Sequence, residues 1–535
     1  MDQSNQPVLT TPSEMTITVP SVITTNTHPL PEVKVDIEHM PVDDDPRKWS
    51  DLRKGFVLLQ VSFGTMIAGL SGSIQNPSIA QMEVDLNATS SQISLTLALF
   101  ILIQGCMPLM WSAISEFKGR KVVYVSSLSI FFAASMVVAR SSTIELVIGF
   151  RCFQAAGSSA VMAIGAATLA DIFEPEVRGT KMGIYYMAPL LGPSLGPILG
   201  GALTTGFGWR GPFYFLAATA GLVALSFLFF FKDTFRRERS LAYQKALKHR
   251  LREEMHKDTE GNRKLVSSNR EEHKEGNTTE CDIEKQEEMQ KIAKDVLPVV
   301  KISWKDMSPV KPLWRIFRRT NNFCILSASG LIFAFCFVVP YTTSRALGTY
   351  YHYSAIKIGL VLLSFGLGNM AGSILGGRWS DYQLTNLKSA NGGKGYPEMR
   401  LRSTIHGSIL FPLFVLGFAW VSDKHVHIAA TVVMLFACGF AVIFVYTSTL
   451  AYIVDSNVGQ SSTAVALNSA FRGIAACIMI EVAVPMQDGL GEGWMYTIFA
   501  GLMVICGFLI LIVAHKGKEW RLAAEEREKQ SEAKP

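Results

Sequence analysis

The most regular feature of the chain is a series of long apolar runs separated by short polar stretches. Runs of roughly 18 to 25 residues recur about twelve times, and a helix of that length crosses the ~30 Å hydrocarbon layer of a membrane. So many uncharged runs cannot all be interior helices of a large soluble protein. We therefore predict an all-α integral membrane protein with helices near residues 55–77, 92–112, 121–139, 144–169, 183–204, 211–231, 322–342, 356–377, 404–421, 426–454, 462–486 and 494–514.

Polar segments divide this series into two halves of six helices each. The first tail has no apolar core of the kind found in cleaved signal peptides, so the first helix is expected to direct membrane insertion. The linker carries charges of both signs, as solvated tethers do. The predicted segments are a disordered N-terminal tail at 1–54, an N-terminal half at 55–231, a linker at 232–321, a C-terminal half at 322–514 and a C-terminal tail at 515–535.

Composition and charge also indicate a membrane protein, and the distribution of charge predicts its orientation in the membrane. The chain is 49% hydrophobic and only 18% charged, which is too little charge for a soluble protein of 535 residues. Most Lys and Arg residues fall in the tails, the linker and the loops at 113–121, 171–182 and 378–403. The positive-inside rule then places both termini in the cytosol, and the net charge of +6 reflects this bias rather than nucleic-acid binding. Asn87, in an outer Asn-Ala-Thr sequence, is a glycosylation candidate, whereas Asn277 in the linker is not.

Two short polar stretches occupy equivalent places in the two halves. SEFKGRK at 115–121 and GGRWSDY at 376–382 each follow the second apolar run of their half, and their acids are 381 − 116 = 265 residues apart. One copy alone would be explained equally well by a basic cytosolic loop. The second copy favours a latch, whose ion pairs form in one conformation and break in another. Its predicted members are Glu116, Gly119, Arg120, Lys121, Gly377, Arg378 and Asp381.

The fourth predicted helix contains RCFQAAGSSA, with Arg151 about two turns from its outer end. An arginine at that depth normally faces the bundle interior or an aqueous cavity, so Arg151 and Gln154 are functional candidates. The alternative is that Arg151 reaches out to the interface or pins two helices together.

A proton carrier needs a carboxylate inside the bundle that gains and loses its proton near neutral pH. The first helix has no acid. Glu481 in the eleventh helix is our first choice, and its alternative role is an ion pair with Arg472 or with a neighbouring helix. Other candidates lie at helix ends: Glu145, Asp171 and Asp455.

The fifth predicted helix is the most specific signal in the chain. Its run APLLGPSLGPILGG repeats glycine and proline at four-residue spacing. Glycines on one face let another helix approach closely, and the prolines bend the helix. A merely kinked packing helix is the alternative. The residues concerned are Pro189, Gly192, Pro193, Gly196, Pro197, Gly200 and Gly201.

Polar and aromatic side chains inside the bundle are candidates for lining a substrate cavity. They would suit flat, amphipathic or cationic cargo through stacking and cation–π contact, although aromatic residues in membrane helices also serve packing. The candidates are Gln60, Gln104, Tyr185, Tyr186, Phe335, Tyr341, Asn369, Tyr446 and Asn468.

These motifs carry a family resemblance. The loop at 115–121 resembles the signature G-x-x-x-D-x-x-G-R-K/R of the major facilitator superfamily, with Ser112 and Glu116 in place of Gly and Asp. RCFQAAG resembles the R-x-x-Q-G motif of its proton-coupled members, with Ala155 in place of Gly, and in that motif the arginine influences proton binding. The fifth helix is similar to the antiporter motif G-x-x-x-G-P-x-x-G-G. The resemblance extends over residues 46 to 515 and implies the major facilitator fold of two six-helix halves.

Further stretches resemble the fungal twelve-helix drug:proton antiporters and, most closely, their quinidine-resistance group. They are DPRKWS, DIFEPEVRGTKMG, YIVDSNVGQSSTAVALNSAFRG and GEGW. The resemblance implies a monomeric multidrug exporter of the plasma membrane that works by alternating access, uses the proton gradient and needs no cofactor. Its partners would be a small-molecule substrate, protons and the lipid bilayer.

Several alternatives stay open. The same group includes exporters of amino acids, polyamines and a spore-wall precursor, so export of one metabolite is an alternative to drug export. A proton-coupled importer, a non-transporting nutrient sensor and residence in a vacuolar or other internal membrane are the others. An enzyme is not expected, because the sequence has no P-loop, no HExxH and no nucleophile elbow.

Overall fold

The structure is a computed structural model, and it describes residues 14–17, 33–36, 44–236, 310–393, 395–457 and 460–532. The chain divides into two units, of which the first is Met1–Asp45 with Phe235–Ser308. This unit contains a two-stranded antiparallel ribbon of β1 (Glu14–Ile17) and β2 (Val33–Asp36). Most of the predicted linker, with Asn277, lies outside the described residues.

The second unit, Pro46–Thr234 with Pro309–Pro535, holds all the described helices. Its N-terminal half consists of η1 (Pro46–Lys48), α1 (Asp51–Leu70), η2 (Asn76–Ser78), α2 (Ile79–Asp85), α3 (Ser90–Cys106), α4 (Pro108–Lys118), α5 (Arg120–Arg140), α6 (Ile144–Ile172), α7 (Pro175–Phe207) and α8 (Gly211–Phe230). Its C-terminal half consists of α11 (Val310–Arg318), α12 (Thr320–Thr349), α13 (Ala355–Ala390), α14 (Glu398–Leu401), η4 (Arg402–Thr404), α15 (Ile405–Asp423), α16 (Ile428–Ser456) and α17 (Ser461–Glu532).

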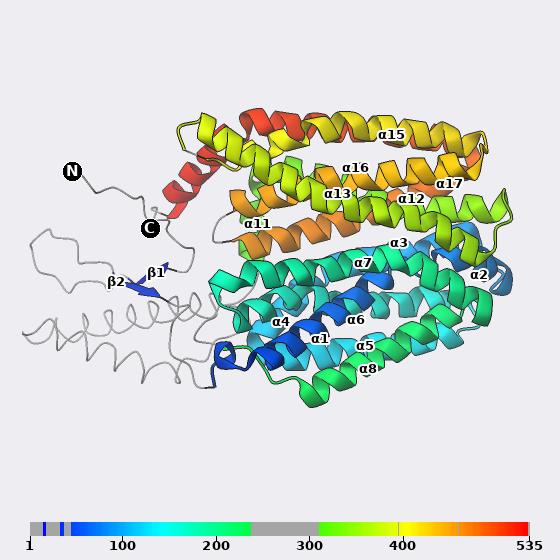
Figure 1. Ribbon diagram of the computed structural model, residues 1–535, viewed down its shortest axis with the longest axis horizontal. Coiled ribbons are helices and arrows are strands. Elements are labelled where there is room, and N and C mark those ends of the chain that lie inside the picture. Colours follow the sequence, from blue (N-terminus) through cyan, green and yellow to red (C-terminus); the bar gives the residue numbers. More distant parts are fainter. Residues whose placement is uncertain are drawn as a thin grey trace, which may run out of the picture. The chain divides into compact units, whose positions relative to one another are not determined.

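Long helices run side by side through this second unit (Figure 1). Eight helices of the described chain are long and apolar enough to cross a membrane, and the bent pair α3 and α4 would make nine. Large apolar side chains such as Leu222, Phe229 and Phe508 are more than 60% exposed. Exposed apolar surface of this kind is stable against lipid and not against water.

The helix α17 accounts for two predicted segments. As a straight rod its 72 residues would be roughly 100 Å long, more than three times the thickness of the hydrocarbon layer. The rod is broken at Gly491, whose φ of 78° is outside the helical region and is tolerated by glycine. Two helices therefore meet there, as the predicted boundary between 486 and 494 requires.

Two predicted helices end or bend earlier than expected. The first was predicted to reach residue 77 but ends at Leu70, where the hydroxyls of Ser71 and Ser73 donate to carbonyls of its last turn and Gly72 disfavours a continued helix. The second was predicted as one segment but bends by 41° between Cys106 and Pro108. Pro108 removes the hydrogen bond that would have continued α3.

The two halves meet along two helix pairs. The helix α3 packs against α17, and α7 packs against α13. We call the end of the bundle that carries α2 and the α12–α13 connection the outer end; the opposite end carries the start of α1 and the α4–α5 turn (Figure 1). The helix pairs position the polar groups described next.

Candidate functional site

The turn between α4 and α5 holds a buried ion cluster. Gly119, with φ 89°, ends α4 and lets Arg120 begin α5 at once. The Arg120 Nη2 donates to Glu116 Oε1 at 2.9 Å, and its Nε lies 3.4 Å from Asp171 Oδ2 at the end of α6. The Arg120 backbone N–H donates to Asp233 Oδ1 at 3.1 Å. We call Glu116, Arg120, Asp171 and Asp233 the N-terminal cluster.

The structure thus brings together three predicted latch residues, Glu116, Gly119 and Arg120. It adds Asp171, which the sequence offered as a proton carrier, and Asp233, which sequence reasoning missed. Lys121, the next predicted member, is half-buried. A methyl group on Gly119 would collide with the Asp233 carboxylate, so this glycine is required by both its backbone angle and its neighbour.

A related cluster lies at the same end of the C-terminal half. Arg400 Nη1 donates to Asp381 Oδ1 at 2.8 Å, and Arg400 Nε also pairs with Asp455 at the end of α16. We call Asp381, Arg400 and Asp455 the C-terminal cluster. Arg378, the cation predicted for this latch, is instead exposed on α13. Gly377 is an ordinary helical residue with open space around it.

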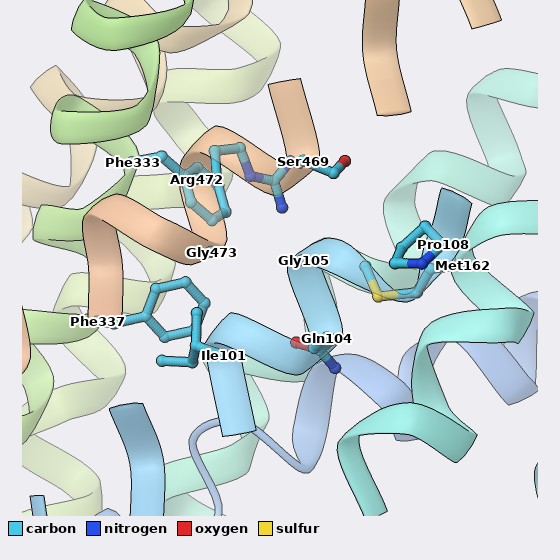
Figure 2. A pocket seen from close by; sticks show the side chains of 10 residues that line it. All are labelled: Ile101, Gln104, Gly105, Pro108, Met162, Phe333, Phe337, Ser469, Arg472 and Gly473. Carbon is cyan, nitrogen blue, oxygen red and sulfur yellow. The ribbon is translucent and has the colours of Figure 1, made fainter. Parts of the chain in front are cut away.

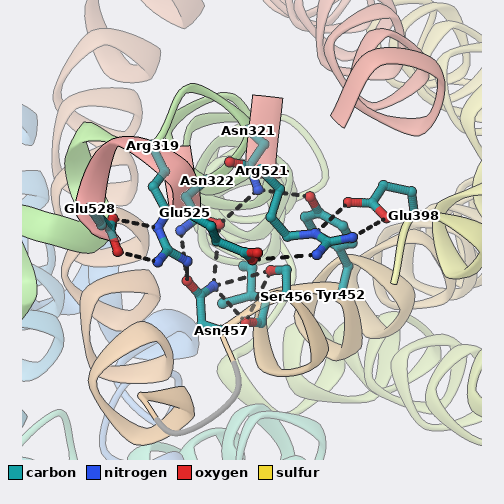
Figure 3. Close-up of polar contacts among 11 residues, drawn as sticks. Arg319, Asn321, Asn322, Glu398, Tyr452, Ser456, Asn457, Arg521, Glu525 and Glu528 are labelled. Atoms are coloured by element: carbon teal, nitrogen blue, oxygen red, sulfur yellow. Dashed lines mark hydrogen bonds and ion pairs between the residues drawn. The ribbon is translucent and has the colours of Figure 1, made fainter. Parts of the chain in front are cut away.

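The last turns of α17 are tied to the C-terminal half by a third set of polar contacts (Figure 3). Arg521 forms a two-pronged ion pair with the buried Glu398, at 3.0 and 3.3 Å. Arg319, at the start of α12, does the same with Glu528, at 3.0 and 2.8 Å. Asn457 is hydrogen-bonded to Asn322 beside them. The predicted C-terminal tail is therefore a docked helix over most of its length.

Arg151 lies in the interior of the N-terminal half and is 0% exposed. Its Nη1 donates to the Ser71 carbonyl at 3.0 Å and to Gln154 Oε1 at 2.7 Å, and its guanidinium lies 4.1 Å from the Phe100 ring centre. The Ser71 carbonyl is available because α1 ends one residue earlier. Gln154 in turn donates to Ser135 at 2.7 Å. The predicted pair is thus one hydrogen-bonded unit that faces inward.

Glu481 lies on α17 at the contact with α3. Its Oε1 accepts a hydrogen bond from Ser94 at 3.1 Å, so the two halves are joined here by a polar contact. The ion pair with Arg472 that the sequence allowed is not formed. The single hydrogen-bond partner of Arg472 among the described residues is the Tyr446 hydroxyl, at 2.8 Å.

A small cavity of about 50 Å³ lies between α3, α6, α12 and α17 (Figure 2). Pocket volumes that enclose a drug-sized ligand are several times larger. The α3 and α17 backbones close it, since a methyl group on Gly105 would lie 2.6 Å from the Ser469 carbonyl oxygen. Its lining residues are Ile101, Gln104, Gly105, Pro108, Met162, Phe333, Phe337, Ser469, Arg472 and Gly473.

One predicted cavity residue, Gln104, lines this cavity. Tyr446 and Asn468 lie just behind it, hydrogen-bonded to each other at 3.3 Å. The other six point elsewhere in this conformation, because helix position alone does not fix which neighbour a side chain meets. Gln60 bonds Ser226, Phe335 packs on Phe411, and Tyr186 is exposed. Tyr185, Tyr341 and Asn369 are buried and do not line the cavity.

The glycine face of α7 packs against the end of α1. A methyl group on Gly192 would lie 2.6 Å from the Gly69 carbonyl carbon, and one on Gly196 or Gly200 would collide with Ser73 or Ile74. On its other side α7 meets α13 of the other half: Ser194 donates to the Gly366 carbonyl at 3.1 Å. The prolines Pro189, Pro193 and Pro197 all lie within the helix, and Gly201 lies close to Ala355 at the start of α13.

Asn87, the predicted glycosylation residue, is exposed in the short connection between α2 and α3. Its φ is 48°, a conformation that asparagine tolerates. Thr89 of the same Asn-Ala-Thr sequence caps α3, accepting from the Gln92 backbone N–H at 3.3 Å.

Comparison with known proteins agrees with this architecture. Residues 61–480 match the Major Facilitator Superfamily. The chain is 27% identical to MFS antiporter QDR3 of Candida albicans, over 93% of this chain and 83% of that protein. It is 24% identical to Quinidine resistance protein 3 of Saccharomyces cerevisiae, over 90% and 85%. It is 26% identical to Citrate exporter 1 of Aspergillus niger, over 89% and 88%.

Among solved structures, the human organic anion transporter MFSD10 (TETRAN) is similar with a TM-score of 0.50. At 16% identity, over 85% of this chain and 99% of that one, the likeness concerns the fold alone. The major facilitator fold and the predicted resemblance to the quinidine-resistance group are confirmed. The chain belongs to the Major Facilitator Superfamily, whose transporters take small molecules across membranes.

Proposed function

We propose that this protein is a proton-coupled antiporter that exports small organic molecules, drugs or toxicants among them, by alternating access. Two relatives carry the names antiporter and quinidine resistance protein, which supports export. We further propose that it acts as a monomer in the plasma membrane, with both termini cytosolic, and needs no cofactor besides the proton gradient.

The observation that carries the proposal is the position of α7. Its glycine face touches the α1 backbone, while Ser194 and Pro197 touch the α13 backbone of the other half. Contacts between backbones leave no soft side chains to absorb motion, so α7 and its neighbours slide or rock as rigid bodies. Such a helix suits a transporter that alternates between two packed states.

Polar contacts between the halves at the outer end support a conformation closed on that side. Ser344 Oγ, on α12, donates to the Asn76 carbonyl. Arg345 Nη2 donates to Ser90 Oγ at 3.0 Å and also pairs with Asp488 at 2.9 Å. An exporter with its outer end closed is in a state that precedes release of cargo to the outside.

Glu481 and Ser94 can stay hydrogen-bonded to each other whether Glu481 is ionised or protonated. With Glu481 ionised, the Ser94 hydroxyl donates to its carboxylate, as the 3.1 Å contact requires. With Glu481 protonated, its hydroxyl can donate to Ser94 Oγ, while Ser94 donates to the Ser91 carbonyl 2.8 Å away. Because the two residues lie on opposite halves, the proton and the contact between the halves are linked.

The test is export of two dyes of matched xanthene shape, anionic fluorescein and cationic rhodamine 123, from cells with and without the protein. We expect expressing cells to retain less of at least one dye, and an uncoupler to raise retention to the level of control cells. Glu481→Gln and Arg151→Ala should remove export without an uncoupler. Glu145→Gln, at an exposed acid of α6, is the matched control and should transport normally.

Gly196→Leu should also abolish export, because leucine cannot fit against Ser73. Leu195→Phe, at a neighbouring residue whose side chain is exposed, should be tolerated. Gradient-dependent accumulation of a dye above the control level would instead identify an importer. Normal export by Gly196→Leu would remove the main argument for an antiporter.

Export of one specific metabolite is the second candidate function. The similarity to Citrate exporter 1 supports it, as does the charge of the central cavity considered next. Selective transport of a single compound in a broad panel would favour this candidate over multidrug export.

A further inference from the structure

The interior of the bundle contains very few charges. Among the described residues, three side chains that are charged at neutral pH lie more than one turn inside the predicted membrane segments: Arg151, Arg472 and Glu481. Two cations and one anion leave a net charge of +2 − 1 = +1, which becomes +2 when Glu481 is protonated. A charge in this setting is costly unless it has a partner or a function.

Neither arginine is paired with a carboxylate among these residues. Arg151 is bonded to a carbonyl and an amide, and Glu481 is bonded to Ser94. Arg472 makes one hydrogen bond, to the Tyr446 hydroxyl, and its buried Nε has no partner. The positive charge of Arg472 is therefore not neutralised by the protein around it.

Arg472 also lies at the cavity and is held in place there. Figure 2 shows its guanidinium beside Phe333, with Ser469 on the same helix. The guanidinium carbon lies 3.8 Å from the Phe333 ring centre, and the Tyr446 hydroxyl fixes one nitrogen. The guanidinium group of Arg472 stacks on one ring and makes one hydrogen bond. Its remaining N–H donors are left for a ligand.

We propose that the cargo of this transporter is an organic anion, whose carboxylate or similar acidic group binds to Arg472 in the central cavity. This inference rests on the proposed export function and specifies its substrate class. It replaces cationic cargo, one of the three kinds (flat, amphipathic or cationic) that the aromatic side chains suggested. An anion would neutralise the +1 interior, whereas a cation entering beside Arg472 would be repelled by it.

The size of the cavity sets a condition on binding. At about 50 Å³ it holds a few water molecules at most, so cargo enters only after α3 and α17 move apart. The contact that must open is the one between Gly105 and Gly473. Cargo can then bind only when these two helices have separated, so binding is coupled to the conformational change that alternating access requires.

The experiment compares the two xanthene dyes in the full-length protein, with membrane abundance measured for every variant. We expect the wild type to export fluorescein and to leave rhodamine 123 inside. Arg472→Gln should lower fluorescein export at least about tenfold, which corresponds to 1.4 kcal/mol of lost interaction. Arg472→Lys should retain part of it, since the charge stays and the planar fork is lost. Arg140→Gln, at an exposed arginine of α5, is the control for loss of one positive charge.

Arg472→Glu adds a measurement that misfolding cannot imitate. Gradient-dependent export of rhodamine 123 should rise above the wild-type level, so that the ratio of fluorescein to rhodamine 123 export falls by more than tenfold through gained cation export. Gradient-dependent export of rhodamine 123 alone, unchanged in Arg472→Gln, would overturn the anion inference and leave the export function standing. Export of neither dye, with no response to the uncoupler, would count against both.

Discussion

The N-terminal and C-terminal clusters have the same plan in the two halves of the molecule. Each has an acid after the second membrane helix, an arginine at the start of the third and an acid at the end of the fourth. The matching pairs are Glu116 with Asp381, Arg120 with Arg400 and Asp171 with Asp455. A duplicated six-helix unit explains the match.

The clusters differ in burial. The Arg120 side chain is 5% exposed, and Asp233 adds a fourth member that binds its backbone. In the C-terminal cluster the matching Arg400 side chain is 19% exposed, and the Asp381 side chain is 72% exposed where Glu116 is 21%. Exposed pairs contribute about 0–1 kcal/mol, whereas removing one partner of a buried pair costs about 3–5 kcal/mol. The same residues therefore form a structural lock in one half and a weak surface contact in the other.

The largest effect is expected from Arg120→Gln. It would remove the buried guanidinium that pairs with both Glu116 and Asp171. We expect a loss of about 3–5 kcal/mol of stability and of nearly all transport, measured by thermal unfolding in detergent and by dye export.

Arg400→Gln is the matched variant of the other half. Because its partners are more exposed, water can solvate Asp381 and Asp455 after the change. Its loss of stability should be less than half that of Arg120→Gln. Equal losses would contradict the distinction between a buried lock and a surface contact.

Glu116→Gln should have the next largest effect. Arg120 would keep Asp171 as a partner, so the fold should survive while the balance between gate states shifts by about 1.4 kcal/mol, a tenfold change in population. Dye export at normal membrane abundance is the measurement. Glu116→Asp should lower dye export only slightly. Wild-type export by Glu116→Gln would mean that the loop is only a basic cytosolic turn and not a latch.

Much of the fold follows from the sequence, because hydrophobic run length alone determines where a membrane helix can lie. One error came from a single proline, Pro108, and another from the serine and glycine residues after Leu70, both inside runs that remain apolar. Hydropathy measures solubility in lipid and does not register a missing amide hydrogen. The glycine face of α7 was also predictable, since glycines repeated along one face of a membrane helix indicate a close contact with another helix.

The ion clusters were only partly predictable. The acids are 265 residues apart, but the arginines are 400 − 120 = 280 apart and the second acids 455 − 171 = 284. The longer loop before Arg400 places this arginine outside the short stretch 376–382, in which Arg378 is the only cation. Asp233 and the cavity position of Arg472 depend on tertiary packing, and no local pattern in the sequence indicates either.

A comparison of two glycines, one from each half, tests the same difference between the halves with a smaller expected effect on stability. Gly119 has a φ of 89° and touches Asp233, whereas Gly377 is helical with nothing within 4 Å of an added methyl group. Gly119→Ala should cost about 1–2 kcal/mol through its backbone alone, and more through the clash. Gly377→Ala should be neutral or stabilise by up to about 1 kcal/mol, since alanine favours helix. Thermal unfolding of both variants is the test, and a reversed order would contradict the assignment of the turn.

Asp381→Asn should have the smallest effect. Its carboxylate is 72% exposed, and Arg400 keeps Asp455 as a partner after the change. We expect export to fall by less than about threefold, because an exposed pair is worth no more than about 1 kcal/mol.

Raising the ionic strength on the cytosolic side of inside-out vesicles should bring the wild type to the level of Asp381→Asn, because salt screens an exposed pair. The same salt should leave the gap between wild type and Glu116→Gln almost unchanged, since the N-terminal cluster is shielded from solvent. If salt removed the difference in export from wild type equally for Asp381→Asn and Glu116→Gln, burial would not be what distinguishes the two clusters.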